Sequence, residues 1–517
     1  MNLPAHVPVL VIGAGPTGLV TAHLLASYGV ETLLVDALPL PQDIPRAVTI
    51  DDEALRALDA CGQIEAVLPH LRPGKGARYF LEDQVPFAEV GPGPKEYGWP
   101  KRNCFHQPDL EHVLIDTLAE QPAVTFARGV RVAAIAQTTD LARVGLETPS
   151  GRHELTASVV IAADGARSTV RSSLGIAMDG DTYPQDWIVL DLARDVDDEP
   201  VSKFHCDPAR PWVSIPTTFG GRRYEFMLLP GERGEDMLKL DVLRKLLAPI
   251  RPLPEEDIMR AAIYTFHARV AERFGEGRIW LLGDAAHLTP PFAGQGMNAG
   301  IRDAHNIAWK AAMVARQEAP AAILSSYEAE RKEPARAMVQ LAVAMGEIIM
   351  AVGEEQLKMR DALFAGLQRF PEARDWLLQM KFKPKPKYDQ GLFLDLHSPE
   401  QPPASLVGAM LPNPMVIGSD SKQARLDRQL GNWFVEIGEG TAMPWPADGP
   451  DRGALRPLRA HRDQCVLVRP DRYVAAAGHD PEALQSEWEK LLQDWVAQWR
   501  RPPLDLLTIL SRHPMAG

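Results

Sequence analysis

Cysteine is scarce in this chain of 517 residues, and its four cysteines do not form a C-x-x-C pair; they are Cys61, Cys104, Cys206 and Cys465. Disulfide-held secreted folds and zinc modules both need closely spaced cysteines. The sequence therefore argues against a disulfide framework and a cysteine-based zinc site, and it fits a reducing compartment.

Basic residues are also in deficit, since 55 Lys and Arg stand against 68 Asp and Glu and leave a formal net charge of -13. Nucleic-acid-binding proteins usually carry a basic surface, so no nucleic-acid partner is expected. One basic pocket can still bind a small anion. No apolar run approaches the roughly 18–20 residues of a membrane-spanning helix, and the N-terminus lacks the pattern of a signal peptide. We therefore expect a cytoplasmic protein without a membrane partner.

Stretches of different pattern divide the chain into domains. Single cores rarely grow beyond about 250–300 residues, so two or more domains are predicted. Residues 1–180 and 271–380 combine buried strands with helices and predict an α/β domain of the Rossmann-like type with a helical extension. Residues 181–270 are rich in β-formers and turns, which predicts an inserted, mostly antiparallel substrate-binding sheet. A linker at 381–387, rich in proline and lysine, then precedes a small α/β domain at 390–517.

A glycine-rich turn links the first predicted strand, Val7–Val11, to a helix. Its G-x-G-x-x-G spacing supplies glycines for a tight turn, for close approach to a pyrophosphate and for helix–strand packing. The second strand ends at a carboxylate about 20 positions further on, where it can accept hydrogen bonds from a ribose. These residues are Gly13, Gly15, Gly18 and Asp36. They predict a dinucleotide site but do not distinguish FAD from NAD.

Two later segments repeat the order strand, glycine turn, helix. Residues 164–171 follow a buried-strand candidate at 157–162, and residues 283–298 follow another at 278–282. With the first turn, these segments resemble in order and spacing the three fingerprints of the class A flavoprotein aromatic hydroxylases, which include phenol hydroxylase and p-hydroxybenzoate hydroxylase. The resemblance covers about residues 7–380 and implies one dinucleotide-binding domain of the GR2 type that binds FAD.

The resemblance also implies which residues hold FAD. The ADP half would lie against Gly13, Gly15, Gly18 and Asp36. The turn that holds the ribityl chain would contain Gly283 and Asp284. Backbone N–H groups suited to the negative charge of a reduced flavin would come from Gly294, Gly296, Met297 and Asn298. Further cofactor contacts are expected from Arg46 and Gln107, and a bridge to the nicotinamide side from Asp164 and Arg167.

Shorter segments narrow the resemblance. Residues 46–55 and 224–232 look like those of 3-(3-hydroxyphenyl)propionate hydroxylases, although related hydroxylases of polyketides share much of this pattern. Residues 469–474 are similar to the thioredoxin-like tail of phenol hydroxylases. Because this tail lacks C-x-x-C, the resemblance implies a structural or oligomerisation role for it, such as forming a homodimer.

By the same resemblance, NADH or NADPH reduces FAD, and O2 forms a flavin C4a-hydroperoxide that hydroxylates a small phenolic acid ortho or para to its hydroxyl. A base or hydrogen-bond acceptor near the phenol would speed this electrophilic step. Candidates from the middle sheet are His205, Tyr224, Tyr264 and His267, although ordinary packing would also explain each of them. Pro291 is expected to present its carbonyl at the flavin edge.

Other charged residues have plainer interpretations. Arg210, Arg222 and Arg223 could bind a substrate carboxylate, but solvated surface positions are expected for them. The run Asp51-Asp52-Glu53 could suggest a metal site, yet its carboxylates suit the positive end of a helix dipole, so no metal is predicted. His287 is expected to support its turn.

Three alternatives stand beside the phenolic-acid hydroxylase. A polyketide-tailoring flavin hydroxylase would use the same scaffold. A flavin-dependent halogenase would also use this scaffold, but the W-x-W-x-I-P segment of that group is absent from the sequence. An FAD-binding interaction module without turnover would need none of the catalytic candidates.

Overall fold

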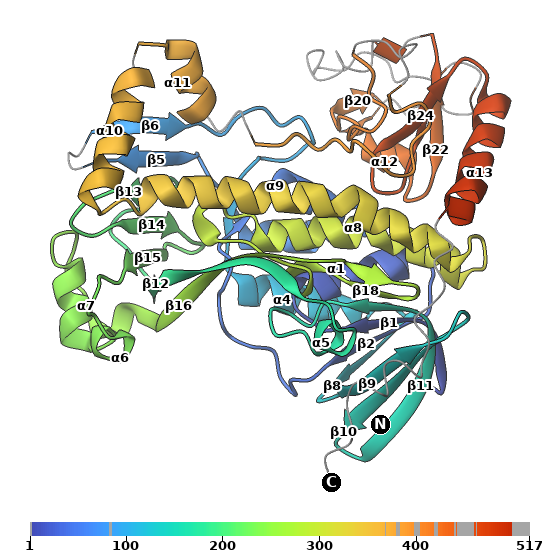
Figure 1. Ribbon diagram of the computed structural model, residues 1–517, viewed down its shortest axis with the longest axis horizontal. Helices are drawn as coiled ribbons and strands as arrows, with labels where there is room; N and C mark the ends of the chain where they lie inside the picture. Colours follow the sequence, from blue (N-terminus) through green and yellow to red (C-terminus); the bar gives the residue numbers. More distant parts are fainter. Residues whose placement is uncertain are drawn as a thin grey trace.

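The structure is a computed structural model, and it describes residues 3–81, 85–367, 369–378, 383–397, 404–417, 422–438, 441, 460–461 and 463–498. Two long helices, α8 (Gly296–Ala315) and α9 (Ser325–Ile349), run through the middle of the molecule. They lie between a parallel sheet, a second sheet and the C-terminal region (Figure 1). A parallel Rossmann-like sheet and an antiparallel sheet, both predicted from the sequence, are therefore present in the fold.

The first sheet is mostly parallel and has the strand order β17-β18-β11-β1-β2-β8, with a hairpin of β9 and β10 attached to β11. Val9, Leu10 and Val11 are fully buried, as expected for a strand covered on both faces. The strands are β1 (His6–Ile12), β2 (Thr32–Asp36), β8 (Val124–Arg128), β9 (Arg131–Gln137), β10 (Ala142–Thr148), β11 (Gly151–Ala162), β17 (Gly275–Glu276) and β18 (Ile279–Leu281). The helices around it are α1 (Pro16–Ser27), α2 (Asp52–Ala60), α3 (Ile64–Val67), α4 (Gln107–Leu118) and α5 (Thr169–Ser173).

The second sheet has the order β19-β16-β12-β15-β14-β13-β5-β6. Its strands are β5 (Ala77–Phe80), β6 (Pro86–Val90), β12 (Met178–Leu192), β13 (Ser202–His205), β14 (Trp212–Pro216), β15 (Arg222–Met227), β16 (Ile258–Ala271) and β19 (His287–Leu288). The antiparallel core over 181–270 agrees with the sequence prediction, but the sheet also recruits β5, which pairs parallel to β13. This pairing covers the open edge of β13 and joins segments more than a hundred residues apart, so no local pattern announces it. Two short helices, α6 (Gly234–Met237) and α7 (Leu240–Leu247), pack their apolar side chains on one face of this sheet.

Smaller elements complete the two domains. A three-stranded sheet joins β3 (Thr49–Ile50), β7 (Asn103–Phe105) and β4 (Leu71–Pro73). The predicted helical stretch continues after α9 with α10 (Glu354–Leu367) and α11 (Pro371–Leu378). In the part of the chain described, no single helix has both the length and the apolarity to cross a membrane; only a sharply bent pair, Ala321–Ile349 with Glu354–Leu367, reaches them jointly.

The described part of the C-terminal region combines short strands with two helices. Its elements are β20 (Met415–Ile417), β21 (Gln423–Arg425), α12 (Asp427–Leu430), β22 (Val435–Gly438), β23 (Cys465–Val468), β24 (Val474–Gly478) and α13 (Pro481–Gln498). Strands β22, β23 and β24 pair antiparallel. The unit does not stand apart, because Leu467, Ala475 and Trp488 pack into the same core as the parallel sheet. Of the predicted linker, residues 381–382 lie outside the described residues, and Lys383 lies 3.6 Å from Asp51.

Candidate functional site

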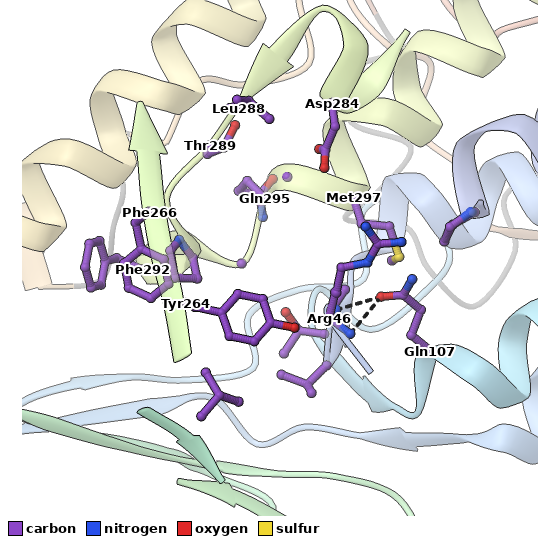
Figure 2. Close-up of a pocket in the computed structure, with 18 of the residues that line it drawn as sticks. Arg46, Gln107, Tyr264, Phe266, Asp284, Leu288, Thr289, Phe292, Gln295 and Met297 are labelled. Atoms are coloured by element: carbon purple, nitrogen blue, oxygen red, sulfur yellow. Dashed lines mark hydrogen bonds between the residues drawn. The ribbon is translucent and has the colours of Figure 1, made fainter. Parts of the chain in front are cut away.

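A cavity of about 420 Å³ lies between the parallel sheet and the second sheet. One half is lined by the glycine turn after β1, the loop at 46–49, the turn after β18 and the start of α8. The other half is lined by one face of the second sheet. In Figure 2, Arg46, Asp284 and Met297 lie on one side of the cavity, and the aromatic rings of Tyr264, Phe266 and Phe292 gather on the other.

The glycine turn after β1 has the geometry that a bound pyrophosphate needs. A Cβ on Gly13 would lie 2.3 Å from the Ala163 carbonyl oxygen, and one on Gly18 would lie 1.8 Å from the Gly13 carbonyl oxygen. Gly15 instead has open space around it and lines the cavity. No side chain caps the start of α1, so its first N–H groups are available to an anion in the cavity.

Asp36 lies at the end of β2 as predicted. Its carboxylate accepts hydrogen bonds from the backbone N–H groups of Ala14 (2.7 Å) and Leu38 (2.8 Å). Asp36 therefore stabilises the backbone next to the glycine turn.

The turn after β18 directs Asp284 into the cavity. This side chain is exposed to the cavity but surrounded by protein, and the desolvation raises its pKa, while Arg46 and His287 act in the opposite direction. Asp303 of α8 holds the turn, because its carboxylate accepts hydrogen bonds from the backbone N–H of Gly283 (3.1 Å) and pairs with Nε2 of His287 (2.6 Å). The expected supporting role of His287 agrees with this geometry.

The start of α8 forms the next part of the wall. Gly294 has a left-handed φ of 62°, and Gly296 and Met297 line the cavity; no side chain caps the helix start. Asn298 does not line the cavity. Its side chain accepts from the backbone N–H of Asp51 (3.0 Å) and donates to the carbonyl of Gly294 (2.8 Å), so it fixes the wall from behind.

The loop that carries Arg46 is held from two sides. The amide oxygen of Gln107 accepts from the backbone N–H groups of Arg46 (3.2 Å) and Ala47 (2.7 Å), as the dashed lines in Figure 2 show. On the other side, Arg223 donates to the carbonyl of Arg46 (2.7 Å) and to that of Pro45. Gln107 thus positions the loop, and the Arg46 guanidinium faces the cavity.

This half of the cavity fits FAD. Two helix starts offer free N–H groups for a pyrophosphate and for an electron-rich ring edge. The space beside Gly15 is open, whereas Gly13 and Gly18 close the turn tightly behind it. Half of the expected FAD contacts line the cavity, and the others do not: Gly13, Gly18, Asp36, Asp164, Arg167, Gly283 and Asn298. Asp164 accepts hydrogen bonds from Ser168 Oγ (2.5 Å) and from the backbone N–H of Val170 (3.1 Å) at the start of α5, and Arg167 is exposed.

The expected catalytic candidates divide into two groups. Tyr264, His267 and Pro291 line the cavity. His205 does not, and its ring is stacked between Phe80 (centroids 4.6 Å apart) and Trp212 (3.6 Å). Burial lowers the pKa of His205 to about 4, so it stays neutral as a packing residue.

Tyr224 also lies outside the cavity, and its hydroxyl donates to Asp195 (3.0 Å) on the face covered by α6 and α7. Side chains alternate between the faces of a strand, so the neighbours of Tyr224, Arg223 and Glu225, face the cavity instead. The prediction chose the wrong face of β15 because every residue of this strand is buried. The sequence did hold a signal for a functional role of Glu225, since this residue is a carboxylate within the otherwise apolar run Tyr224–Met227.

The three arginines expected at the surface have buried or paired guanidinium groups. Arg210 pairs with Glu232, and Arg222 donates to backbone carbonyls and to Ser214 Oγ (2.8 Å). Arg223 makes a bidentate pair with Asp191. The prediction of solvated positions was wrong for Arg222 and Arg223, which are 0% and 3% exposed.

Arg102, which the sequence did not single out, also lines the cavity. Its carbonyl accepts from the backbone N–H of Gly74 (3.0 Å), and the carbonyl of the nearby Gly76 accepts from Ser202 of β13 (3.1 Å). Among the described residues, the Arg102 guanidinium has no carboxylate within 4.0 Å. A cation without an acidic partner at the wall of a cavity is suited to an anionic ligand. It follows a loop and shows no periodic pattern, so the sequence alone offered no signal for it.

The run Asp51-Asp52-Glu53 begins α2, as predicted. Asp51 is the N-cap and its side chain accepts from the backbone N–H of Ala54 (3.0 Å). Arg302 pairs with Asp51 and with Glu53 (2.8 Å), and Lys383 lies 3.6 Å from Asp51 and 3.9 Å from Glu53, so two cations face these two carboxylates.

Comparisons with known proteins agree with this geometry. Residues 6–342 match the family model described as FAD binding domain. The 3-(3-hydroxy-phenyl)propionate/3-hydroxycinnamic acid hydroxylase of Mycolicibacterium smegmatis is 36% identical, and the match covers 92% of this chain and 91% of that protein. The protein of the same description from Burkholderia cenocepacia is 38% identical, with 90% and 93% covered. The crystal structure of the flavin-dependent monooxygenase PieE in complex with FAD and substrate has the same fold at 22% identity, with a TM-score of 0.79 and coverage of 95% and 99%.

Proposed function

Because the chain belongs to the FAD-dependent aromatic hydroxylases, the class A flavin monooxygenases, we propose that its substrate is a small phenolic acid such as 3-(3-hydroxyphenyl)propionate. The observation that carries this proposal is a single cavity that joins the FAD-fitting half to an aromatic half containing Arg102. The aromatic rings suit a benzene ring, and the Arg102 guanidinium, which has no carboxylate within 4.0 Å in the described part of the chain, suits a carboxylate. The substrate of the relatives has both groups in its printed name.

When bound, FAD supplies electrons from NAD(P)H and activates O2 for transfer to a ring carbon ortho or para to the hydroxyl. The chain's own residues orient the substrate, shield the reaction from water and stabilise negative charge. Free N–H groups at Gly296 and Met297 would stabilise negative charge at the edge of the reduced ring. Phe266 and Phe292 exclude water from the space beside it, which limits wasteful loss of activated oxygen. Pro291 would present its carbonyl at the same edge.

A polyketide-tailoring hydroxylase is less well supported than a phenolic-acid hydroxylase. A large neutral polycyclic substrate would leave Arg102 facing the cavity without a counter-ion. The relatives from Mycolicibacterium smegmatis and Burkholderia cenocepacia, at 36% and 38% identity, are hydroxylases of a phenolic acid, whereas the solved structure of PieE at 22% identity bears on the fold alone. A module without turnover is disfavoured by membership of a family of monooxygenases.

Several finer predictions remain part of this proposal. The domain limits are 1–180 with 271–380, 181–270 and 390–517, and the last is a thioredoxin-like unit without C-x-x-C. NADH is the expected reductant, and Asp164 and Arg167 would act at the entrance where the nicotinamide approaches. The protein is expected in the cytoplasm, and the tail would support a homodimer.

The test is an absorbance spectrum of the purified protein followed by oxygen uptake with a panel of phenols. We expect a yellow protein whose NADH oxidation and oxygen uptake rise with 3-(3-hydroxyphenyl)propionate, and mass spectrometry should find a product heavier by one oxygen atom. Phenol without the acidic side chain should stimulate uptake far less. A yellow protein that hydroxylates neutral polycyclic phenols but no phenolic acid would contradict the proposed substrate.

A further inference from the structure

Glu225 is a carboxylate placed among apolar side chains in the middle of the second sheet. It lies directly opposite Val189 of β12 and Val213 of β14, so on its face of the sheet both cross-strand neighbours are valines. The residue is 6% exposed and lines the cavity on its aromatic side. A buried carboxylate that faces a cavity needs a partner, because desolvation of the charge is costly.

Glu225 has a cationic neighbour in the protein, but that cation does not hydrogen-bond to it. The nearest cation is Arg223, 3.8 Å away, which is too far for a hydrogen bond. The guanidinium of Arg223 is already bound to Asp191 at 2.7 and 3.0 Å and to the carbonyls of Pro45 and Arg46. One cation is therefore shared by two carboxylates, and Glu225 is left facing the cavity with no hydrogen bond among the described residues.

This environment sets the proton affinity of the carboxyl group. Burial raises the pKa of Glu225 to about 6, with Arg223 acting to lower it and Asp191 acting to raise it. The other titratable or charged groups that line this cavity are Arg46, Arg102, Tyr264, His267 and Asp284. At neutral pH most of the Glu225 population is ionised, yet the group binds a proton far more readily than an ordinary surface carboxylate.

We propose, on the basis of the proposed function above, that Glu225 is the catalytic residue that accepts the hydroxyl proton of the phenolic substrate. As activated oxygen passes an OH group to the ring carbon ortho or para to the hydroxyl, a pair of ring π electrons forms the new C–O bond. The O–O bond breaks, and its electron pair stays on the oxygen left behind, which takes a proton from water. The ring thereby loses electron density, and the phenol O–H becomes acidic. Glu225 takes that proton, and the ring oxygen becomes the carbonyl of a cyclohexadienone. The hydrogen on the attacked carbon then leaves as a proton to water while Glu225 returns its proton to the ring oxygen, so the ring regains aromaticity and the carboxylate is restored.

Other groups in the cavity are worse placed for this role. The Tyr264 hydroxyl already accepts a hydrogen bond from Arg260 (2.8 Å). His267 is bound to Thr182 Oγ1 (2.9 Å), and burial together with Arg269 lowers its pKa. Ser202, which lines the cavity together with Arg102, is on β13, two strands from β15, which is a lateral distance of roughly 10 Å. An arylpropionate could therefore direct its hydroxyl to Glu225 and its carboxylate toward Arg102.

The kinetic test compares the FAD-loaded wild-type enzyme with Glu225→Gln, Glu225→Asp and the matched control Glu89→Gln, which changes an exposed carboxylate on β6 of the same sheet. Product formation from the phenolic acid is measured over a pH range that brackets 6. We expect the wild-type kcat/KM to rise with pH through about 6 and then level off. Glu225→Gln should lose this rise and about 10²–10⁴-fold in rate. Glu225→Asp should keep the rise with a smaller loss, and Glu89→Gln should match the wild type.

A second measurement separates Glu225 from the identity of the substrate. Calorimetry on FAD-loaded protein compares binding of the phenolic acid with that of its methyl ether, which has no hydroxyl proton to donate. We expect the wild type to prefer the phenol and Glu225→Gln to lose most of this preference. If the wild type hydroxylates no phenolic acid but shows this dependence on Glu225, the proposed substrate fails and the role of Glu225 stands. If Glu225→Gln keeps the wild-type preference and pH profile, the proposal for Glu225 is overturned whatever the substrate.

Discussion

Arg46 and Arg102 both line the cavity, and neither has a carboxylate within 4.0 Å of its guanidinium in the part of the chain described. Arg46 lies in the FAD-fitting half, near Asp284 and Met297 (Figure 2). Arg102 lines the other half with Ser202 and Phe204. This separation favours different ligands for the two positive charges, with Arg102 left for the carboxylate of the proposed substrate.

Arg102→Met should therefore weaken binding of the phenolic acid more than it slows turnover. A charge-assisted hydrogen bond contributes roughly 1.5–3 kcal/mol, so KM should rise about 10–100-fold with kcat changed much less. Steady-state kinetics with 3-(3-hydroxyphenyl)propionate measure this change. The matched control is Lys101→Met, which removes a neighbouring exposed charge and should leave KM unaltered. An equal loss with phenol, which has no carboxylate, would show that Arg102 acts otherwise.

At the scale of elements, the sequence predicted the local turns and helix starts, but it did not predict which side chains of a strand face the cavity. The glycine turn after β1, the turn at Asp284 and the start of α8 depend on neighbours in the sequence, so their spacing identified them. Strand β15 is buried on both faces, so its pattern could not separate Tyr224 from Glu225. The pairing of β5 with β13 joins distant segments, and no local preference encodes it.

The contact between α1 and the turn after β1 makes a prediction at this scale. In Gly18→Ala, the new Cβ would lie 1.8 Å from the Gly13 carbonyl oxygen, so the start of α1 must move away from the turn. FAD affinity should fall at least about 10-fold, which is about 1.4 kcal/mol. The ratio of flavin to protein absorbance and titration of the apoprotein with FAD measure it. Gly145→Ala on β10 is the control, because its Cβ would meet Ala134 Cβ at an ordinary 3.5 Å. Equal FAD affinity in the two variants would contradict the structural role assigned to Gly18.

At the scale of the whole molecule, a buried ionic cluster fastens the C-terminal region to the two long helices. Glu330 of α9 accepts hydrogen bonds from Arg469 (2.9 and 2.7 Å) and from Lys310 of α8 (2.8 Å), and all three side chains are fully buried. Arg469 also pairs with Asp471. Burial alone would raise the pKa of Glu330, but Arg469 and Lys310 outweigh it and hold that pKa at about 2.

Removing the cation of this cluster should loosen the attachment of the tail. Arg469→Met leaves Glu330 and Asp471 with an uncompensated buried charge, which should cost about 3–5 kcal/mol of unfolding free energy. Urea denaturation followed by tryptophan fluorescence measures the loss. Lys358→Met, which breaks an exposed pair with Glu354 on α10, should cost no more than about 1 kcal/mol. Because the pKa of Glu330 is lower in the folded state, its contribution to stability is complete above its ordinary value of 4.5 and is lost as the pH falls toward about 2. The wild type should lose stability across this acid window. Arg469→Met should lose less of it, since its Glu330 keeps Lys310 but lacks Arg469, the cation that lowers its pKa most. Parallel acid curves for the two proteins would mean that other carboxylates govern the acid sensitivity of the molecule.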